Sequence, residues 1–382
     1  MPSRAERLYE LGQSIWLDFI RRGHLVSGEF DRLVRESGVV GVTSNPTIFQ
    51  QAITQSHDYD DTLSRLVGEG LEPAAIFDRL AAEDIQDACD RLRPVFERTD
   101  GLDGRVSIEV GPALAKDTTG TIAEVRRLRG LVSRDNVMVK IPATAEGVAA
   151  IHESIADGSC INVTLIFSLA RYEQVMEAYV SGLERRAARG EDLSNIVSVA
   201  SFFVSRVDTK VDKAIDEFVK TLSQTDPRRD ELIASRGKAA IANARLAYAR
   251  FLEVFGSKRF AALSAKGARV QRPLWASTST KNPAYPDTMY VDELVGPDTV
   301  NTLPPQTLEA YNDHGSLEVR IGKDLPAARA LFERLPELGI PLERLIDELE
   351  GEGVAAFAKS YDDLIAGIES RRREFAGARG GR

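Results

Sequence analysis

Short apolar runs alternate with longer amphipathic segments along most of the chain. This alternation is typical of a parallel sheet whose strands are connected by helices. The runs that we interpret as strands, the last less distinct than the others, are 14–20, 38–45, 105–110, 137–143, 161–167, 196–203, 272–278 and 298–303. Eight such strands predict an α/β fold, a closed (β/α)8 TIM barrel with additional helices. An open dinucleotide-binding sheet would need a Gly-rich turn after its first strand, and the sequence has none there.

The C-terminal part of the chain, from Pro304 onward, has the pattern of helices. Within it, GEGVAA at 351–356 follows a helical segment, and we interpret it as a turn between two helices. No segment has the composition of a linker between domains. We therefore expect a single barrel domain over 1–375, including N-terminal and C-terminal helices, and a disordered tail over 376–382.

Several predicted strands carry polar residues opposite their apolar side chains. In VMVKIPA, alternation places Val137, Val139 and Ile141 towards the helices and Lys140 towards the barrel axis, near the C-terminal end of the strand. The other strands contribute Asp18, Asn45, Glu109, Asn162, Thr164 and Ser201. Active sites of such barrels lie at the C-terminal ends of the strands, so together these residues predict a catalytic site.

Each of these residues also has a simpler structural interpretation. An isolated asparagine or serine in a strand is more often a structural hydrogen bonder than a functional group. Glu109 could lie at the solvated end of its strand, and Lys140 could extend to water at the barrel mouth. The catalytic interpretation therefore depends on the whole set rather than on any single member.

The residue types narrow the chemistry. The histidines, His24, His57, His152 and His314, lie outside the predicted strands, so a histidine-bound metal or a histidine triad has no obvious members. We therefore expect no metal and no cofactor. A desolvated lysine amine can attack a carbonyl carbon, and the resulting Schiff base is an electron sink for C–C cleavage. A nearby carboxylate is needed to move protons during dehydration of the carbinolamine.

Composition excludes several other classes of protein. The net charge is −9 and the basic residues are scattered, which argues against a nucleic-acid or anionic-membrane surface. The only cysteines, Cys89 and Cys160, rule out a disulfide framework and fit a reducing compartment. The sequence shows no signal peptide and no apolar stretch long enough to span a bilayer, so we expect a soluble, cytoplasmic protein.

Several blocks of sequence together resemble the transaldolase family in its longer bacterial form. They are GVTSNPTIF (41–49), SIEV (107–110), VMVKIPAT (137–144), INVTLIFS (161–168), SFFVSRVD (201–208) and LWASTSTKNPAYPDTMYVDELVGPDTVNTLPPQT (274–307). The resemblance runs from about residue 10 to about residue 370. It implies a Schiff-base transferase of the pentose phosphate pathway. Such an enzyme moves a dihydroxyacetone unit from sedoheptulose 7-phosphate or fructose 6-phosphate to glyceraldehyde 3-phosphate or erythrose 4-phosphate.

The resemblance also implies roles for individual residues. Lys140 matches the Schiff-base lysine, and Asp18 matches the base at the C4 hydroxyl. Glu109 matches an acid/base that works through a water, and Thr164 matches the residue that holds this water. Further matches, to residues that hydrogen-bond the substrate or bind its phosphate, are Asn45, Asn162, Ser201 and Arg206. Without the resemblance, Arg206 would be interpreted as a surface residue.

The sequence departs from the family at the phosphate site. Shorter relatives often carry an arginine after the Ala-Ser pair of the seventh strand, whereas this chain has ASTSTKN. Lys281 is the nearest substitute, and Ser277 is also expected near the phosphate. Phe203 stands where related fructose 6-phosphate aldolases tend to have tyrosine, and Glu109 where they tend to have glutamine. Both residues favour a transferase over an aldolase that releases dihydroxyacetone.

Three alternative functions remain open at this stage. The first is a fructose 6-phosphate aldolase, which releases dihydroxyacetone to water. The second is a non-catalytic barrel that binds sugar phosphates as a sensor or scaffold. The third, a metal-dependent barrel isomerase or aldolase, is disfavoured by the shortage of histidines. The sequence is compatible with either a monomer or a homodimer.

Overall fold

Eight parallel strands form a closed barrel in the computed structural model, which describes residues 2–380. Each strand pairs with the next along the chain, and the last pairs with the first. The strands are β1 (Gln13–Leu17), β2 (Val39–Val42), β3 (Arg105–Glu109), β4 (Val137–Pro142), β5 (Ile161–Ile166), β6 (Ser198–Phe203), β7 (Arg272–Ala276) and β8 (Thr299–Leu303). Each strand overlaps its predicted run, so the predicted TIM barrel is confirmed.

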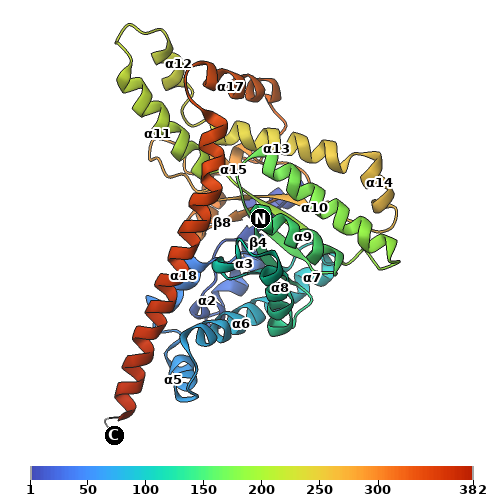
Figure 1. The fold of residues 1–382 in the computed structure, drawn as a ribbon, viewed down its shortest axis with the longest axis vertical. Helices are drawn as coiled ribbons and strands as arrows, with labels where there is room; N and C mark the ends of the chain where they lie inside the picture. Colours follow the sequence, from blue (N-terminus) through green and yellow to red (C-terminus); the bar gives the residue numbers. More distant parts are fainter. Residues whose placement is uncertain (1, 381–382) are drawn as a thin grey trace.

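Helices connect the strands and surround the barrel, and additional helices extend from it (Figure 1). The crossover segments contain α2 (Arg22–Val26), α3 (Glu29–Glu36), α4 (Pro46–Thr54), α5 (Asp60–Gly68), α6 (Pro73–Arg91), α7 (Arg93–Arg98), the short 3₁₀ helix η1 (Pro112–Leu114), α8 (Thr118–Val132), α9 (Ala145–Ala156), α10 (Leu169–Ala188), α11 (Ser205–Thr221), α12 (Arg228–Ala234), α13 (Ala239–Phe255), α14 (Lys258–Ser264) and α15 (Met289–Glu293). The terminal helices are α1 (Arg4–Glu10), α16 (Pro305–His314), α17 (Leu325–Glu337) and α18 (Leu342–Gly380).

Short polar residues start the helices that follow several strands. Asn45 caps α4 by accepting a hydrogen bond from the Ile48 amide at 3.0 Å, and Pro46 occupies the first turn of this helix. Thr144 caps α9 in the same way through the Gly147 amide at 3.0 Å. A capping side chain satisfies an amide that the helix leaves unpaired, so it fixes where the chain turns from strand into helix.

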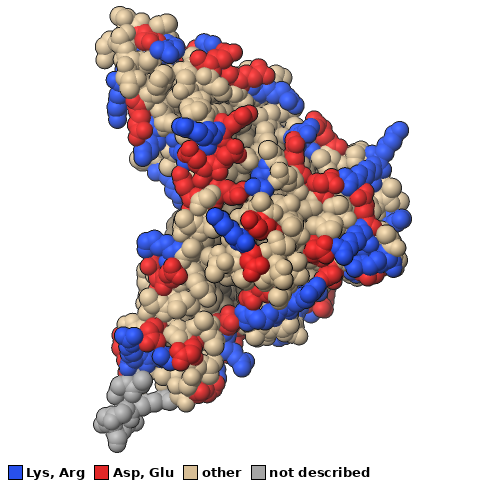
Figure 2. All heavy atoms as spheres, in the orientation of Figure 1, with Lys and Arg blue, Asp and Glu red and all other residues tan. Residues whose placement is uncertain are grey.

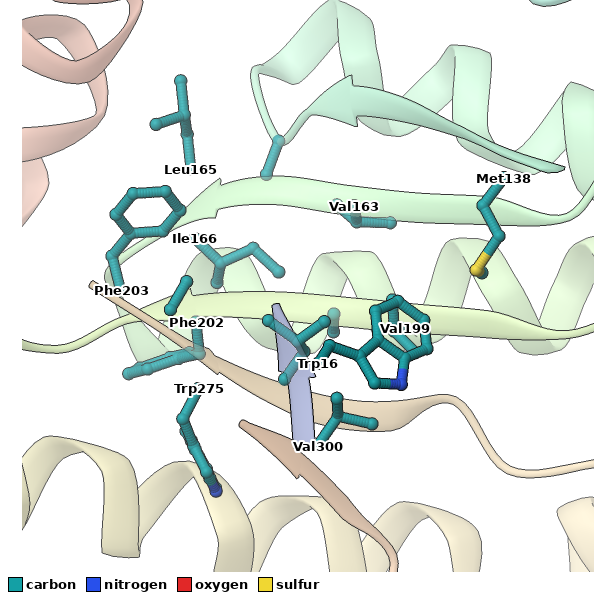
Figure 3. Packing of buried hydrophobic residues seen from close by; sticks show 14 of the residues in the cluster. Trp16, Met138, Val163, Leu165, Ile166, Val199, Phe202, Phe203, Trp275 and Val300 are labelled. Carbon is teal, nitrogen blue, oxygen red and sulfur yellow. The ribbon is translucent and has the colours of Figure 1, made fainter. Parts of the chain in front are cut away.

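The two ends of the barrel differ in chemistry. Apolar side chains such as Trp16, Met138 and Val300 fill the interior (Figure 3). At the N-terminal end, Arg272 and Asp103 form a buried ion pair at 2.9 Å. The Trp16 indole also donates a hydrogen bond to Asp103, at 3.0 Å. Because neighbouring donors satisfy the Asp103 carboxylate, we interpret this pair as a structural ion pair that closes the N-terminal end of the barrel. The polar groups described below lie at the opposite, C-terminal end.

The turn predicted at 351–356 is wrong, because this segment lies inside the continuous helix α18. A β-carbon added to Gly353 would come within 3.0 Å of the Leu165 side chain, so the glycine allows close packing of α18 on β5. Helix packing therefore outweighs the cost of about 1 kcal/mol that glycine carries in a helix interior. The same helix continues to Gly380, so 376–380, assigned to the tail by sequence, has a helical backbone, while residues 381–382 lie outside the described residues.

Candidate active site

Lys140 lies at the C-terminal end of the barrel and is almost fully buried, with 4% of its surface exposed. Its Nζ lies 3.2 Å from Glu109 Oε2 and donates a hydrogen bond to the Ser44 carbonyl oxygen at 2.9 Å. The strand register explains this arrangement, because Glu109 pairs with Lys140 on the neighbouring strand and Lys140 pairs with Asn162 on the next. Residues that pair across parallel strands point to the same face, here the barrel interior.

A second carboxylate, Asp18, follows β1 directly and lines the same cavity as Lys140. The Thr43 hydroxyl lies 2.7 Å from Asp18 Oδ1 and also 2.7 Å from the Thr302 hydroxyl. This chain of hydroxyl groups fixes the orientation of the carboxylate. Asp18 is therefore held in place by the strands on both sides of it, β2 and β8.

Burial and the nearby lysine have opposite effects on the two carboxyl groups. Burial raises the pKa of both Asp18 and Glu109 above their ordinary values, and the positive charge of Lys140 partly opposes this rise. A carboxyl group with a raised pKa can hold a proton closer to neutral pH, as acid–base catalysis requires. The pair of carboxyl groups can thus both accept and donate protons beside the amine.

Asn162 on β5 links side chains of β3 and β6 through hydrogen bonds. Its amide nitrogen donates to the Ser107 hydroxyl at 3.0 Å, and its amide oxygen accepts from the Ser201 hydroxyl at 2.7 Å. The Thr164 hydroxyl is buried and makes no hydrogen bond to a described residue, and Glu109 Oε2 faces the Lys140 amine at 3.2 Å. Because Thr164 also lines the cavity, its hydroxyl has a free hydrogen-bonding position that a substrate or a water could occupy.

A cavity of about 270 Å³ joins most of the predicted residues at the barrel mouth. Its lining includes Asp18, Asn45, Lys140, Thr164, Ser201, Phe203, Arg206, Ser277 and Lys281. Glu109 and Asn162 lie outside this lining, beside Lys140 and Ser201 respectively. The structure therefore brings the predicted residues together, while their individual roles remain predictions.

The predicted phosphate-binding residues lie on the β6, β7 side of the cavity. The guanidinium of Arg206 stacks over the Phe203 ring, 5.4 Å from its centroid, and pairs with no carboxylate among the described residues within 4.0 Å. Burial lowers the pKa of Arg206, because the cation loses hydration there. A desolvated cation without a carboxylate partner is stabilised when it binds an anion. Lys281 is exposed and donates a hydrogen bond to the Ser279 hydroxyl at 2.7 Å. Ser277, with a positive φ of 56°, contacts the Ser205 hydroxyl at 2.9 Å.

Sequence reasoning missed several contributors to the site, among them Thr43, Ser44, Thr302 and Phe357. Thr43 and Thr302 follow the same two-residue alternation as the predicted residues and could have been found by it. Ser44 contributes a backbone carbonyl, for which side-chain chemistry gives no signal. Phe357 comes from α18 and has no relation to any strand pattern.

A buried carboxyl group supports the helix that carries Arg206. Asp208, on α11, accepts hydrogen bonds from the Ala240 amide at 2.7 Å and the Tyr290 hydroxyl at 2.8 Å. Burial raises the pKa of Asp208 to about 7. Because this value is above that of the unfolded chain, the native state binds the extra proton, and stability is lost as pH rises from about 4 through 7.

We expect Asp208→Asn to remove this pH dependence, because the amide can still accept from Ala240 and contact Tyr290 without charge. The unsubstituted protein should lose stability from pH 5 to pH 8, and the variant should not. The difference in unfolding free energy between them should therefore shift by about 1–3 kcal/mol in favour of the variant over this range. Denaturant titrations at both pH values measure this difference. Glu217→Gln, at an exposed position of the same helix, is the matched control. A gain that is equal at both pH values would contradict the prediction.

The described residues include neither a cluster suited to a metal ion nor a helix suited to crossing a bilayer. Among them, no group of three or more His, Cys, Asp or Glu side chains is arranged to hold a metal ion. None of the described helices is both long enough and apolar enough to span a bilayer. The cysteines Cys89 and Cys160 are both free, the first buried and the second partly exposed.

The chain is similar to known proteins over nearly its full length. The profile of the family described as Transaldolase/Fructose-6-phosphate aldolase matches residues 15–368. A transaldolase of Thermobifida fusca is 50% identical over 368 residues, covering 96% of this chain and 97% of the relative. Transaldolase 2 of Streptomyces coelicolor is 48% identical over 381 residues and covers 100% of both chains. A transaldolase of Trichodesmium erythraeum is 45% identical over 363 residues, covering 94% of this chain and 95% of the relative. The chain belongs to the transaldolase/fructose-6-phosphate aldolase family.

Proposed function

We propose that this protein is a transaldolase that transfers a dihydroxyacetone unit between sugar phosphates through a Schiff base on Lys140. The donor is sedoheptulose 7-phosphate or fructose 6-phosphate, and the acceptor is glyceraldehyde 3-phosphate or erythrose 4-phosphate. The observation that carries the proposal is the position of the Lys140 amine, buried beside Glu109 and in one cavity with Asp18. An amine flanked by two carboxylates has the groups needed to form and use an imine.

In the first step, the neutral Lys140 amine attacks the C2 carbonyl of the ketose and forms a carbinolamine. Loss of water then requires a proton at the departing oxygen. Glu109 is the proposed donor, acting directly or through a water held by Thr164, whose hydroxyl is buried and free of other described partners. The product is an iminium ion, in which C2 carries the positive charge that drives the next step.

In the second step, Asp18 takes the proton of the C4 hydroxyl and the C3–C4 bond breaks. The electron pair of that bond moves into the iminium and leaves a three-carbon enamine on Lys140, while an aldose phosphate departs. Addition of the acceptor aldehyde reverses the same sequence of steps. The hydrogen bond from Thr43 keeps Asp18 oriented during both directions of the reaction.

Arg206 and Lys281 are proposed to bind the phosphate group at the far end of the sugar. We expect Arg206→Ala to raise the KM for fructose 6-phosphate by about 10- to 100-fold, since a hydrogen bond to a charged group contributes about 1.5–3 kcal/mol. Steady-state kinetics measure this change. Turnover of unphosphorylated fructose, itself expected to be slow, is the internal control and should not change. An equal loss with both substrates would argue against phosphate binding by Arg206.

One assay separates transfer from the two principal alternatives. The protein is incubated with fructose 6-phosphate and erythrose 4-phosphate, and sedoheptulose 7-phosphate, glyceraldehyde 3-phosphate and free dihydroxyacetone are quantified. Transfer predicts sedoheptulose 7-phosphate with little free dihydroxyacetone, whereas an aldolase would release dihydroxyacetone. A non-catalytic sugar-phosphate-binding barrel would yield none of these products. Phe203 and Glu109, which replace the tyrosine and glutamine expected of an aldolase, favour transfer.

We further propose that the protein acts in the cytoplasm on small molecules and binds neither nucleic acid nor membrane. The free cysteines and the acidic net charge of −9 support this. On the face in Figure 2, basic and acidic side chains are interspersed rather than gathered in a patch of one sign. Both a monomer and a homodimer are compatible with this function.

A further inference from the structure

Helix α18 runs beside the barrel (Figure 1) and is held by side-chain contacts at several points along its length. Before Phe357, Glu350 forms an ion pair with Arg171 on α10 at 2.8 Å. After it, the Ser360 hydroxyl lies 2.8 Å from the Thr47 hydroxyl on α4. Further along, Arg371 donates to the Ile53 carbonyl at 2.9 Å. These contacts fix the position of the helix on both sides of residue 357.

The depth at which α18 packs is set by an unusual pair of residues. Leu165 has a φ of +59°, at a register irregularity of β5 between Val163 and Ile166. For a leucine this conformation costs on the order of 1–3 kcal/mol. It places Leu165 against Gly353, whose added β-carbon would lie only 3.0 Å from the leucine side chain. Leu165 lies at the same end of the strands as Phe203 in Figure 3.

Phe357 lies one helical turn after Gly353 and therefore on the same side of α18. Its side chain is buried, and its ring centroid is 5.9 Å from Lys140 Nζ. It lines the cavity together with Lys140 and Thr164, and it also lines a small hollow beside Glu109. A distance of 5.9 Å is at the limit of a cation–π contact, so the ring acts mainly by covering the amine.

We propose that the Phe357 ring keeps water away from the covalent intermediate, so that the three-carbon unit is transferred to an aldehyde and not released by hydrolysis. This inference rests on the proposed function. In the competing reaction, the enamine carbon takes a proton and the oxygen of a water adds to the imine carbon. The added water returns one proton to the solvent and passes the other to Lys140 Nζ, the C–N bond breaks with its electron pair going to Nζ, and dihydroxyacetone leaves. An apolar ring over this position excludes the water that the reaction requires.

The experiment compares Phe357→Ala and Phe357→Leu with the unsubstituted protein. Fructose 6-phosphate is supplied with erythrose 4-phosphate, and the ratio of free dihydroxyacetone to transferred product is measured. We expect this ratio to rise by about tenfold in Phe357→Ala and by less in Phe357→Leu, which keeps part of the apolar cover. Phe375→Ala, which removes another phenylalanine ring from the same helix, should leave the ratio unchanged.

A ratio that stays unchanged in folded Phe357→Leu and Phe357→Ala would overturn the inference. An equal rise in Phe375→Ala would also overturn it, because general loosening of α18 would then explain the effect. If Phe357→Ala does not fold, the smaller rise in Phe357→Leu decides. The proposed function itself fails only if the unsubstituted protein neither transfers the three-carbon unit nor forms a borohydride-trapped adduct on Lys140.

Discussion

Replacement of Lys140 by methionine should reduce transfer by on the order of 10⁴-fold or more, the scale of losses seen when an enzyme loses its nucleophile. Methionine nearly preserves the shape of the side chain but has no amine to attack the ketose carbonyl. Trapping is the direct measurement. With fructose 6-phosphate and borohydride, the unsubstituted protein should gain a mass adduct located on Lys140, and the variant should gain none.

The variant is expected to fold, because its loss of charge is accommodated by the neighbouring acid. Burial already raises the pKa of Glu109, and without the Lys140 cation its carboxyl group can remain protonated and neutral. The melting temperature checks this. Lys258→Met, at an exposed lysine of α14, is the matched control and should keep full activity and the adduct. An adduct of equal yield on another lysine of Lys140→Met would refute the assignment.

Asp18→Asn should stop the reaction one step later. The variant retains the Lys140 amine, so the Schiff base can still form, but no carboxylate takes the proton of the C4 hydroxyl. We expect cleavage to slow by about 10²- to 10⁴-fold, the usual contribution of a general base. Borohydride trapping should then yield an adduct carrying the intact six-carbon sugar phosphate, whereas the unsubstituted protein should also yield the three-carbon adduct.

The asparagine can preserve the local structure, since its amide oxygen can accept the hydrogen bond that Thr43 now donates to Asp18. Asp135→Asn, at a carboxylate that is 84% exposed, is the control for loss of one negative charge. If Asp18→Asn accumulated the three-carbon adduct instead, cleavage would proceed without Asp18. Another group would then have to act as the base at C4.

The sequence predicted the fold from the alternation of apolar runs and amphipathic segments, and a second rule predicted five residues of the cavity lining: Asp18, Asn45, Lys140, Thr164 and Ser201. Strand side chains alternate between two faces, so a polar residue out of phase with apolar neighbours points into the barrel. Lys140 and Glu109 satisfied this rule, and the strand register then brought them side by side. Arg206 did not satisfy it, because it follows its strand on α11, and only the family resemblance suggested its place.

A buried charge in a strand was not by itself a reliable signal of function. Arg272 also lies in an apolar strand and forms a buried ion pair with Asp103, yet it closes the N-terminal end of the barrel. The Arg272–Asp103 pair differs from the Lys140–Glu109 pair in two ways. It lies at the N-terminal rather than the C-terminal end of the strands, and more neighbouring groups donate hydrogen bonds to its carboxylate. Position follows from the sequence once the strands are known, whereas hydrogen-bond satisfaction depends on the packed structure.

What the sequence determined by itself was therefore local and periodic: the strands, the helices between them and the inward-facing Lys140, Glu109 and Asp18. Tertiary structure alone decided that 351–356 continues a helix and that Phe357 covers the Lys140 amine. It also supplied the Ser44 carbonyl as the acceptor for that amine. These features arise from contacts between segments far apart in the chain, where packing energy overrides local propensity and no periodic pattern records the partner.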